Sequence, residues 1–193
     1  MRGGAAHREK KVSFVDHCDH LLSCCDGGFE VTNNSEPGQD RYDEGLWDQL
    51  LARFMPARPI WGFGSDDTHD LRKAKQTYNI FFLNKPGESE VRKAMIAGRF
   101  CFCESTRRID YTKQPLEPSE FPELKEIKVD QDAGTISISA SNFDEIRWFS
   151  APQSLEPVAD YLTSDNPWPP GQLVHVGSTL NVKANPKLRN YVR

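Results

Sequence analysis

The sequence lacks the features that mark a protein that binds nucleic acid or spans a membrane. Its 193 residues carry 24 Lys and Arg against 28 Asp and Glu, a formal net charge of −4, which gives no positive field for nucleic acid or an anionic membrane. The longest basic run, at residues 8–11, is interrupted by Glu9. No apolar stretch approaches the roughly 18 residues that a membrane helix needs. The first seven residues have no apolar core, so a signal peptide is not expected.

Cysteine is scarce, and its spacing fits neither a disulfide framework nor a zinc site. The chain has five Cys, an odd number. Cys24 and Cys25 are adjacent, and Cys101 and Cys103 alternate along one expected strand. Neither pair forms a C-x-x-C motif. We interpret these residues as small buried thiols in a reducing compartment, which favours the cytoplasm.

Residues 28–103 predict an alternation of strands and helices. Apolar side chains recur on one face between Asp43 and Phe54, which predicts an amphipathic helix. A second helix is expected to begin with Ser89 as its cap and to end at Gly98. The expected strands lie at 29–33, 60–63, 78–83 and 99–103. Continuous apolar strands that alternate with helices are typical of an α/β layer.

The character of the sequence changes at a proline-rich segment, residues 115–118, which we interpret as a linker. Only short strands are expected beyond it, beginning with a hairpin. They lie at 124–129, 135–140, 145–149, 173–176 and 179–182. The sequence therefore predicts two domains, an α/β domain at 1–114 and a small antiparallel β-sandwich at 118–193.

The segment Ser65–Asp70 contains acids and one His directly after an expected strand. Asp67 and His69 are two residues apart, so in an extended segment their side chains point the same way. A carboxylate and an imidazole aimed at one point suit Zn, Mn or Fe. An acidic loop ahead of a helix is also common turn and N-cap chemistry, which is the alternative interpretation.

Four motifs in order resemble a known family. A strand ends in Glu30-Val31-Thr32-Asn33, a helix contains Trp47-Asp48-Gln49-Leu50-Leu51, a strand ends in Ser65-Asp66-Asp67-Thr68-His69, and a helix leads through Ala94–Phe100 into a strand. This series resembles the C-terminal half of PHP proteins, the polymerase-and-histidinol-phosphatase family of metal-dependent phosphoesterases. The resemblance implies an α/β fold, a partial, distorted β/α barrel of PHP type, followed by a β-sandwich extension.

The resemblance also implies a metal site. Asp67 and His69 match the last two metal ligands of the family, and His7 is the candidate for an earlier ligand. Asp66 matches a carboxylate that holds a ligand in place. The complete family site holds two or three divalent ions, either Zn, Mn or Fe, which activate water to hydrolyse a phosphate ester.

The implied substrate is a small phosphate ester. Asn33 matches a residue at the rim of the site. Arg8 or Arg41 can contact phosphate, and either can equally be a solvated surface residue. Arg8 also follows His7 where the family has Pro.

The opening H-x-H motif of the family has no counterpart here, so we expect the chain to be a fragment that is inactive alone. An incomplete barrel would leave one sheet edge and an apolar face open, which predicts self-association. The alternative function is a non-enzymatic module that binds a ligand or partner through a degenerate half barrel. A third hypothesis is carbohydrate binding by Trp148, Phe149 and Trp168. An H-x-H in sequence upstream of Met1 would favour the enzyme.

Overall fold

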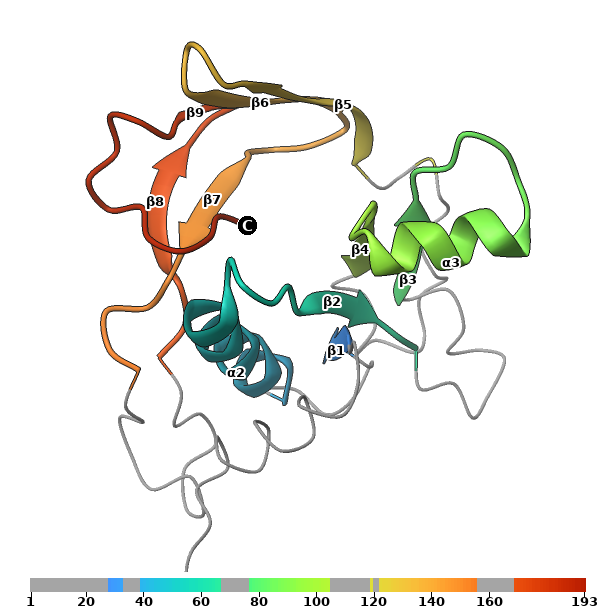
Figure 1. Cartoon of the computed structure of the whole chain (residues 1–193), viewed down its shortest axis with the longest axis horizontal. Coiled ribbons are helices and arrows are strands. Elements are labelled where there is room, and N and C mark those ends of the chain that lie inside the picture. The colour runs from blue at the N-terminus through green and yellow to red at the C-terminus, as the bar shows by residue number, and fades with distance from the viewer. Residues whose placement is uncertain (1–27, 33–38, 67–76, 105–118, 120–121, 156–168) are drawn as a thin grey trace, which may run out of the picture.

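The computed structural model describes residues 28–32, 39–66, 77–104, 119, 122–155 and 169–193. Its elements are β1 (Gly28–Thr32), α2 (Gln39–Phe54), β2 (Trp61–Gly64), β3 (Thr77–Phe81), α3 (Glu88–Ile96), β4 (Phe100–Glu104), β5 (Glu123–Asp130), β6 (Thr135–Ser141), β7 (Arg147–Ser150), β8 (Gln172–Val176) and β9 (Thr179–Asn181). Figure 1 shows three groups: α2 with β1 and β2, α3 with β3 and β4, and β5 to β9. Within the described residues, no helix combines the length and apolar character of a membrane span.

Strands β1 and β2 form a parallel pair. Gly28 lies opposite Trp61, and Thr32 lies opposite Gly64. A parallel pair needs a crossover connection, and α2 lies in the connection between the two strands. The carboxyl ends of both strands therefore lie at the same edge.

The apolar face of α2 packs against this pair, as the sequence predicted for this helix. Leu46 and Leu50 are almost fully buried, together with Ile60 before β2. The indole N–H of Trp47 donates to the Ile60 carbonyl at 2.9 Å. Gly62 allows this close approach, because a Cβ at that position would come within 2.7 Å of the Trp47 ring. Burial of this stripe, and not helix propensity alone, stabilises α2.

Strands β3 and β4 form a separate antiparallel pair. Thr77 lies opposite Glu104, and Phe81 lies opposite Phe100. The two ends of the connection between these strands meet, because the Phe82 N–H, just after β3, donates to the Arg99 carbonyl, just before β4, at 3.0 Å. Helix α3 therefore returns the chain to the end of β3 and does not carry it back to the start.

The prediction of an α/β fold with a partial PHP-type barrel is wrong. The described residues form small, mostly antiparallel sheets with two helices, and β1 with β2 is the one parallel pair among them. A barrel needs each crossover to deliver the next strand in parallel to the same sheet. Here β4 reverses against β3, so the two strands form their own sheet. The sequence pattern predicted the elements but not the direction in which they pair.

The ends of α3 test two predictions. Gly98 has φ of 65° and follows the last residues of the helix, so the predicted stop is confirmed. Ser89 is not the cap: Gly87 occupies the cap position, without a side-chain hydrogen bond. The Gly87 carbonyl accepts from the N–H groups of Glu90 and Val91, both at 3.1 Å. Backbone bonds thus start this helix.

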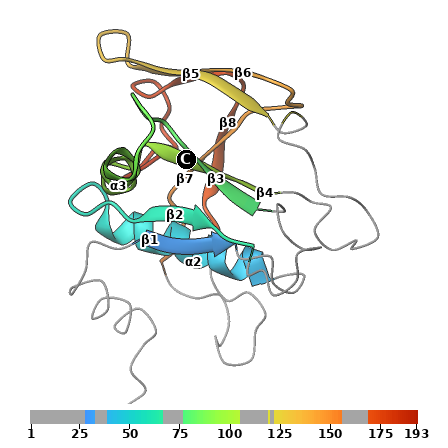
Figure 2. The same cartoon turned by 90° about the vertical axis from the view of Figure 1, so that its right-hand side faces the viewer.

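Strands β5 to β9 are antiparallel. β5, β6 and β9 form one sheet and β7 with β8 another, and the predicted hairpin between β5 and β6 is confirmed. Trp148, Val174 and Leu180 form the buried core of this region. Figure 2 shows β7 and β8 running between the β5–β6 hairpin and α2.

A buried ionic cluster joins this region to α2. Asp48 on α2 is fully buried, and its carboxylate accepts from the Gly171 N–H at 2.6 Å and the Tyr191 hydroxyl at 2.6 Å. The Arg193 guanidinium donates to both Asp48 oxygens, at 2.7 and 2.8 Å, and to Glu44 at 2.7 Å. Every oxygen of this buried carboxylate therefore has a donor.

Gln49 makes a second connection from α2. Its amide N–H donates to the Ser154 and Pro169 carbonyls, at 3.1 and 3.0 Å. The predicted domain boundary between 114 and 118 lies outside the described residues, and the division into two domains stays a prediction.

Candidate functional site

All but one of the residues that the PHP resemblance assigns to the site lie outside the described part of the chain. Those residues are His7, Arg8, Asn33, Asp67 and His69. Asp66 is described, and it comes two residues after the end of β2. The site can therefore be built from Asp66 and from the strand ends around it.

Asp66 lies where the carboxyl ends of β1 and β2 meet. The Ser65 N–H donates to the Thr32 carbonyl at 2.8 Å, which joins the two strand ends. The Asp66 carboxylate accepts from the Thr77 N–H at 2.5 Å, so its orientation is fixed by the start of β3. In the sequence, Asn33 directly follows one strand end, and Asp67 directly follows Asp66.

A second carboxylate, that of Glu104, lies at the same edge. Glu104 lies opposite Thr77 in the β3–β4 pair, and its side chain accepts a hydrogen bond from Thr32. Burial raises the pKa of Glu104, the bond from Thr32 lowers it, and the charge of Glu44 raises it again, with a net rise. Glu104 remains partly exposed to solvent. We name this group the polar edge; its residues are Thr32, Ser65, Asp66, Thr77 and Glu104.

Close packing holds the polar edge in place. A Cβ on Gly64 would come within 2.5 Å of the Thr77 methyl group, so only glycine lets β3 approach β2 here. The Asn79 side chain bonds both backbone groups of Gly64, at 3.1 Å to the N–H and 2.7 Å to the carbonyl. Thr77 is buried, and within the described residues its Oγ1 has no hydrogen-bond partner.

The donor set of the polar edge fits a hard or borderline divalent cation. Two carboxylates and an unpartnered buried hydroxyl offer oxygen atoms, which such cations prefer. The set is incomplete, because no three His, Cys, Asp or Glu side chains of the described ranges are grouped to hold a metal.

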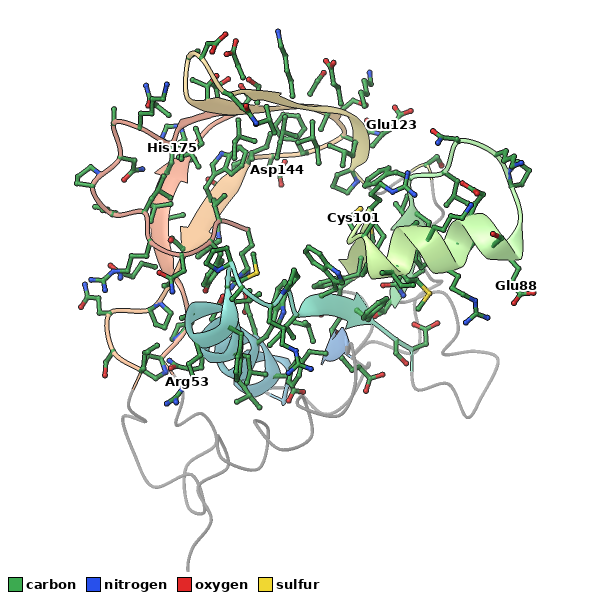
Figure 3. All side chains as sticks on the ribbon, viewed as in Figure 1. Arg53, Glu88, Cys101, Glu123, Asp144 and His175 are labelled. Carbon is green, nitrogen blue, oxygen red and sulfur yellow. The ribbon has the colours of Figure 1, made fainter. Side chains whose placement is uncertain are left out.

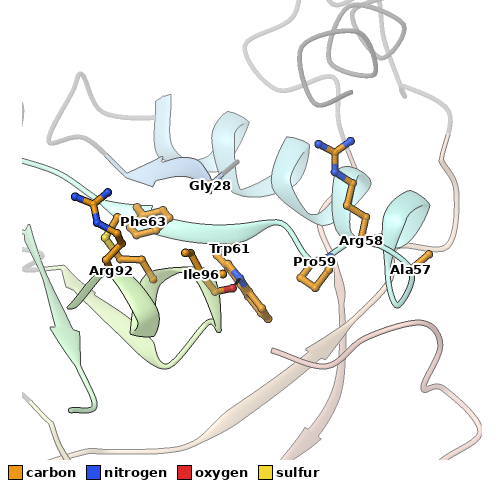
Figure 4. Close-up of a pocket in the computed structure, with 9 residues that line it drawn as sticks. Gly28, Ala57, Arg58, Pro59, Trp61, Phe63, Arg92 and Ile96 are labelled. Carbon is orange, nitrogen blue, oxygen red and sulfur yellow. Dashed lines mark hydrogen bonds between the residues drawn. The ribbon is translucent and has the colours of Figure 1, made fainter. Parts of the chain in front are cut away.

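A cavity of about 550 Å³ lies elsewhere, beside α3 and β2. Its walls include Trp61, Phe63 and Ile96, and Figure 4 shows Arg58 and Arg92 on opposite sides of Trp61. The Trp61 indole N–H donates to the Ile96 carbonyl at 3.0 Å, which closes one wall. The cavity is large enough for a small organic ligand with an apolar body.

Sequence reasoning missed Thr77 and Glu104. Each stands at the end of an expected strand, which is a weak signal for a site residue. Their meeting depends on the antiparallel register of β3 with β4, and a strand pattern does not give the partner or the direction of pairing.

No protein-family model, no curated protein and no solved structure matches this chain. The resemblance to PHP proteins and the metal ligands that it implies therefore stay predictions.

Proposed function

We propose that this chain carries part of the site of a metal-dependent phosphoesterase, located at the polar edge. One observation supports the proposal above others: β1 and β2 are parallel, and their carboxyl ends are joined by the bond from Ser65 to Thr32. In the sequence, Asn33 directly follows the end of β1, and Asp67 comes three residues after the end of β2. In α/β units, ligands bind in the crevice outside the carboxyl ends of parallel strands.

The described residues would position the ligands. Asp66 is held by the Thr77 amide, so the chain leaves β2 in a fixed direction just before Asp67. The carboxylates of Asp66 and Glu104 place negative charge at the polar edge, which favours a cation. Asp67, His69 and His7 are the proposed ligands, and Asn33 and Arg8 the proposed contacts to substrate.

The bound ions, Zn, Mn or Fe, would supply a water with a pKa near neutrality and neutralise charge on the phosphate ester. The protein would orient the ester and exclude bulk water. The described residues do not complete a ligand set, so we expect weak metal binding and no turnover by the chain alone.

Calorimetric titration of the full chain with Mn²⁺ or Zn²⁺ tests the proposal. We expect one or more ions to bind, and Asp67→Asn and His69→Asn each to abolish the strongest heat. Asp66→Asn should weaken binding by about tenfold or more, because it removes a group that positions a ligand. His175→Asn on β8 is the matched control and should bind as the original chain does. Equal binding by the original chain and all four variants would overturn the proposal.

Hydrolysis of p-nitrophenyl phosphate tests the expected lack of turnover. No EDTA-sensitive activity should appear with the chain alone. Rapid EDTA-sensitive hydrolysis would contradict the expectation of an inactive fragment and would strengthen the assignment as a phosphoesterase.

The cavity beside α3 favours a second candidate, a non-enzymatic binding module. Its aromatic and aliphatic walls with two flanking arginines suit an organic anion with an apolar body. An anionic fluorescent probe such as 8-anilinonaphthalene-1-sulfonate would bind in EDTA, would be lost in Trp61→Ala and would be kept in Asp67→Asn. The reverse pattern would favour the metal site.

A further inference from the structure

Two thiols on β4 form a pair that neither the polar edge nor the cavity uses. Cys101 and Cys103 are both half-buried and both free. They are two residues apart on a strand, so both side chains project from the same face. The thiols are hydrogen-bonded to each other. This contact shows that the two sulfur atoms can approach one point.

The opposite face of β4 carries half-buried aromatic side chains that contact β2 and α2. Phe100 stacks on Phe63 with ring centroids 4.4 Å apart. Phe102 meets the Trp47 ring edge-on, with ring centroids 6.3 Å apart. These contacts hold the backbone of β4 in place. They do not involve the face that carries Cys101 and Cys103, which we name the thiol face. Figure 3 shows Cys101 on the side of β4 that is turned away from α2.

The two thiols share one face of the β3–β4 pair with Tyr78. The bond from Cys103 lowers the pKa of Cys101, and the same bond, with burial, raises the pKa of Cys103. Tyr78 lies opposite Cys103 in the register, and burial and the two thiols raise its pKa to about 12. Tyr78 therefore stays neutral near pH 7 and adds no negative charge beside the two thiols.

A disulfide does not fit this backbone. Residues two apart on a strand are about 6.6 Å apart at Cα, and their Cβ atoms, which point the same way, are about equally far apart, whereas a disulfide needs the two Cβ atoms about 3.8 Å apart. Two metal–sulfur bonds of about 2.3 Å each span a wider gap. A metal ion can bridge the sulfur atoms with the strand unchanged.

We propose that Cys101 and Cys103 form a binding site for a soft, two-coordinate d¹⁰ metal ion, with Cu(I) as the representative ion. Soft thiolate ligands select Cu(I). Zn(II) requires four ligands, and the described residues around the pair supply no third His, Cys, Asp or Glu for it. Binding replaces two S–H bonds by two Cu–S bonds and releases two protons, with no change in oxidation state.

Competition with bathocuproine disulfonate under anaerobic conditions tests the site. The full chain is used with Cys18, Cys24 and Cys25 changed to Ser, so that the β4 pair holds the remaining thiols. We expect one Cu(I) per chain and two protons released. Cys101→Ser and Cys103→Ser should each weaken binding by about 100-fold or more, because each removes one arm of a chelate.

Two further measurements keep the test decisive if a variant folds poorly. Tyr78→Phe keeps both thiols and should bind Cu(I) unchanged. In the chain with the β4 pair intact, bound Cu(I) should protect both Cys101 and Cys103 from iodoacetamide, as read by peptide mass spectrometry. Equal Cu(I) affinity with and without the pair, no protection, or ready formation of a Cys101–Cys103 disulfide by oxidised glutathione would overturn the proposal.

Discussion

At the scale of single residues, Asp48 shows how one buried charge organises its surroundings. It is fully buried on α2, and Gly171, Tyr191 and Arg193 donate to it. The Arg193 guanidinium also lies over the Phe149 ring, 4.8 Å from its centroid. Burial and the charge of Asp48 raise the pKa of Tyr191, so its hydroxyl stays a donor. A buried carboxylate is tolerated only with such partners.

Arg193→Met should destabilise the protein by about 3–5 kcal/mol, because it leaves the Asp48 charge buried without a counter-ion. Urea unfolding measures the change. The Met side chain keeps much of the apolar contact, so the loss reports mainly on charge.

Arg92→Met is the matched control, because Arg92 pairs with Glu88 at 3.0 Å on an exposed face of α3. This exposed pair should contribute less than about 1 kcal/mol. Equal losses for both variants would show that Asp48 does not depend on Arg193.

Glu104 should give the protein a pH dependence. Its folded-state pKa is raised, so the folded protein binds the proton more tightly than the unfolded chain. Stability should therefore fall as pH rises from the ordinary Glu pKa through the raised value, and stay lower above it. Glu104→Gln should remove this slope in thermal unfolding measured across that window. Glu126→Gln, at an exposed position on β5, should leave the slope in place.

At the scale of elements, the turn after α3 depends on Gly98. Its φ of 65° is unfavourable for other residues, and a Cβ there would come within 2.5 Å of the Trp61 ring. Gly134 has φ of 66° but faces the flexible Lys183 side chain. Gly134→Ala should cost about 1 kcal/mol from the backbone alone. Gly98→Ala should cost more, because the Trp61 ring must move; an equal cost in urea unfolding would contradict this.

The sequence predicted the elements better than their pairing. Apolar periodicity placed α2 and most strands within a few residues, because burial of one face sets that pattern. The reversal of β4 against β3 was missed, because it depends on how α3 returns the chain to Phe82. The Ser89 cap was missed because the Gly87 carbonyl starts the helix instead.

At the scale of the whole molecule, one buried core spans distant parts of the sequence. Leu46, Leu50 and Ile60 lie in the same cluster as Ala151 and Tyr191. A sheet of only two strands is marginally stable alone, so packing against this shared core stabilises the two-stranded sheets. Such long-range contacts leave little trace in local sequence patterns, and no motif marked Tyr191 as a core residue.

The candidate site could be predicted only in part for the same reason. The position of Asp66 beyond β2 follows from the strand pattern, whereas its bond to Thr77 and the nearby Glu104 follow from tertiary pairing. Self-association stays a prediction; Ile96, 70% exposed beside the cavity, is one apolar residue that it could cover.

The Asp48 cluster also implies an order of folding events during synthesis. Gly171 and Arg193 lie 123 and 145 positions after Asp48 in the chain. At ribosomal speeds of roughly 5–20 residues per second, Asp48 is made about 7–30 seconds before Arg193. During that interval Asp48 can keep its charge only in contact with water. We therefore expect α2 to stay loosely packed until Arg193 is available, so that its docking against the C-terminal strands is a late folding step.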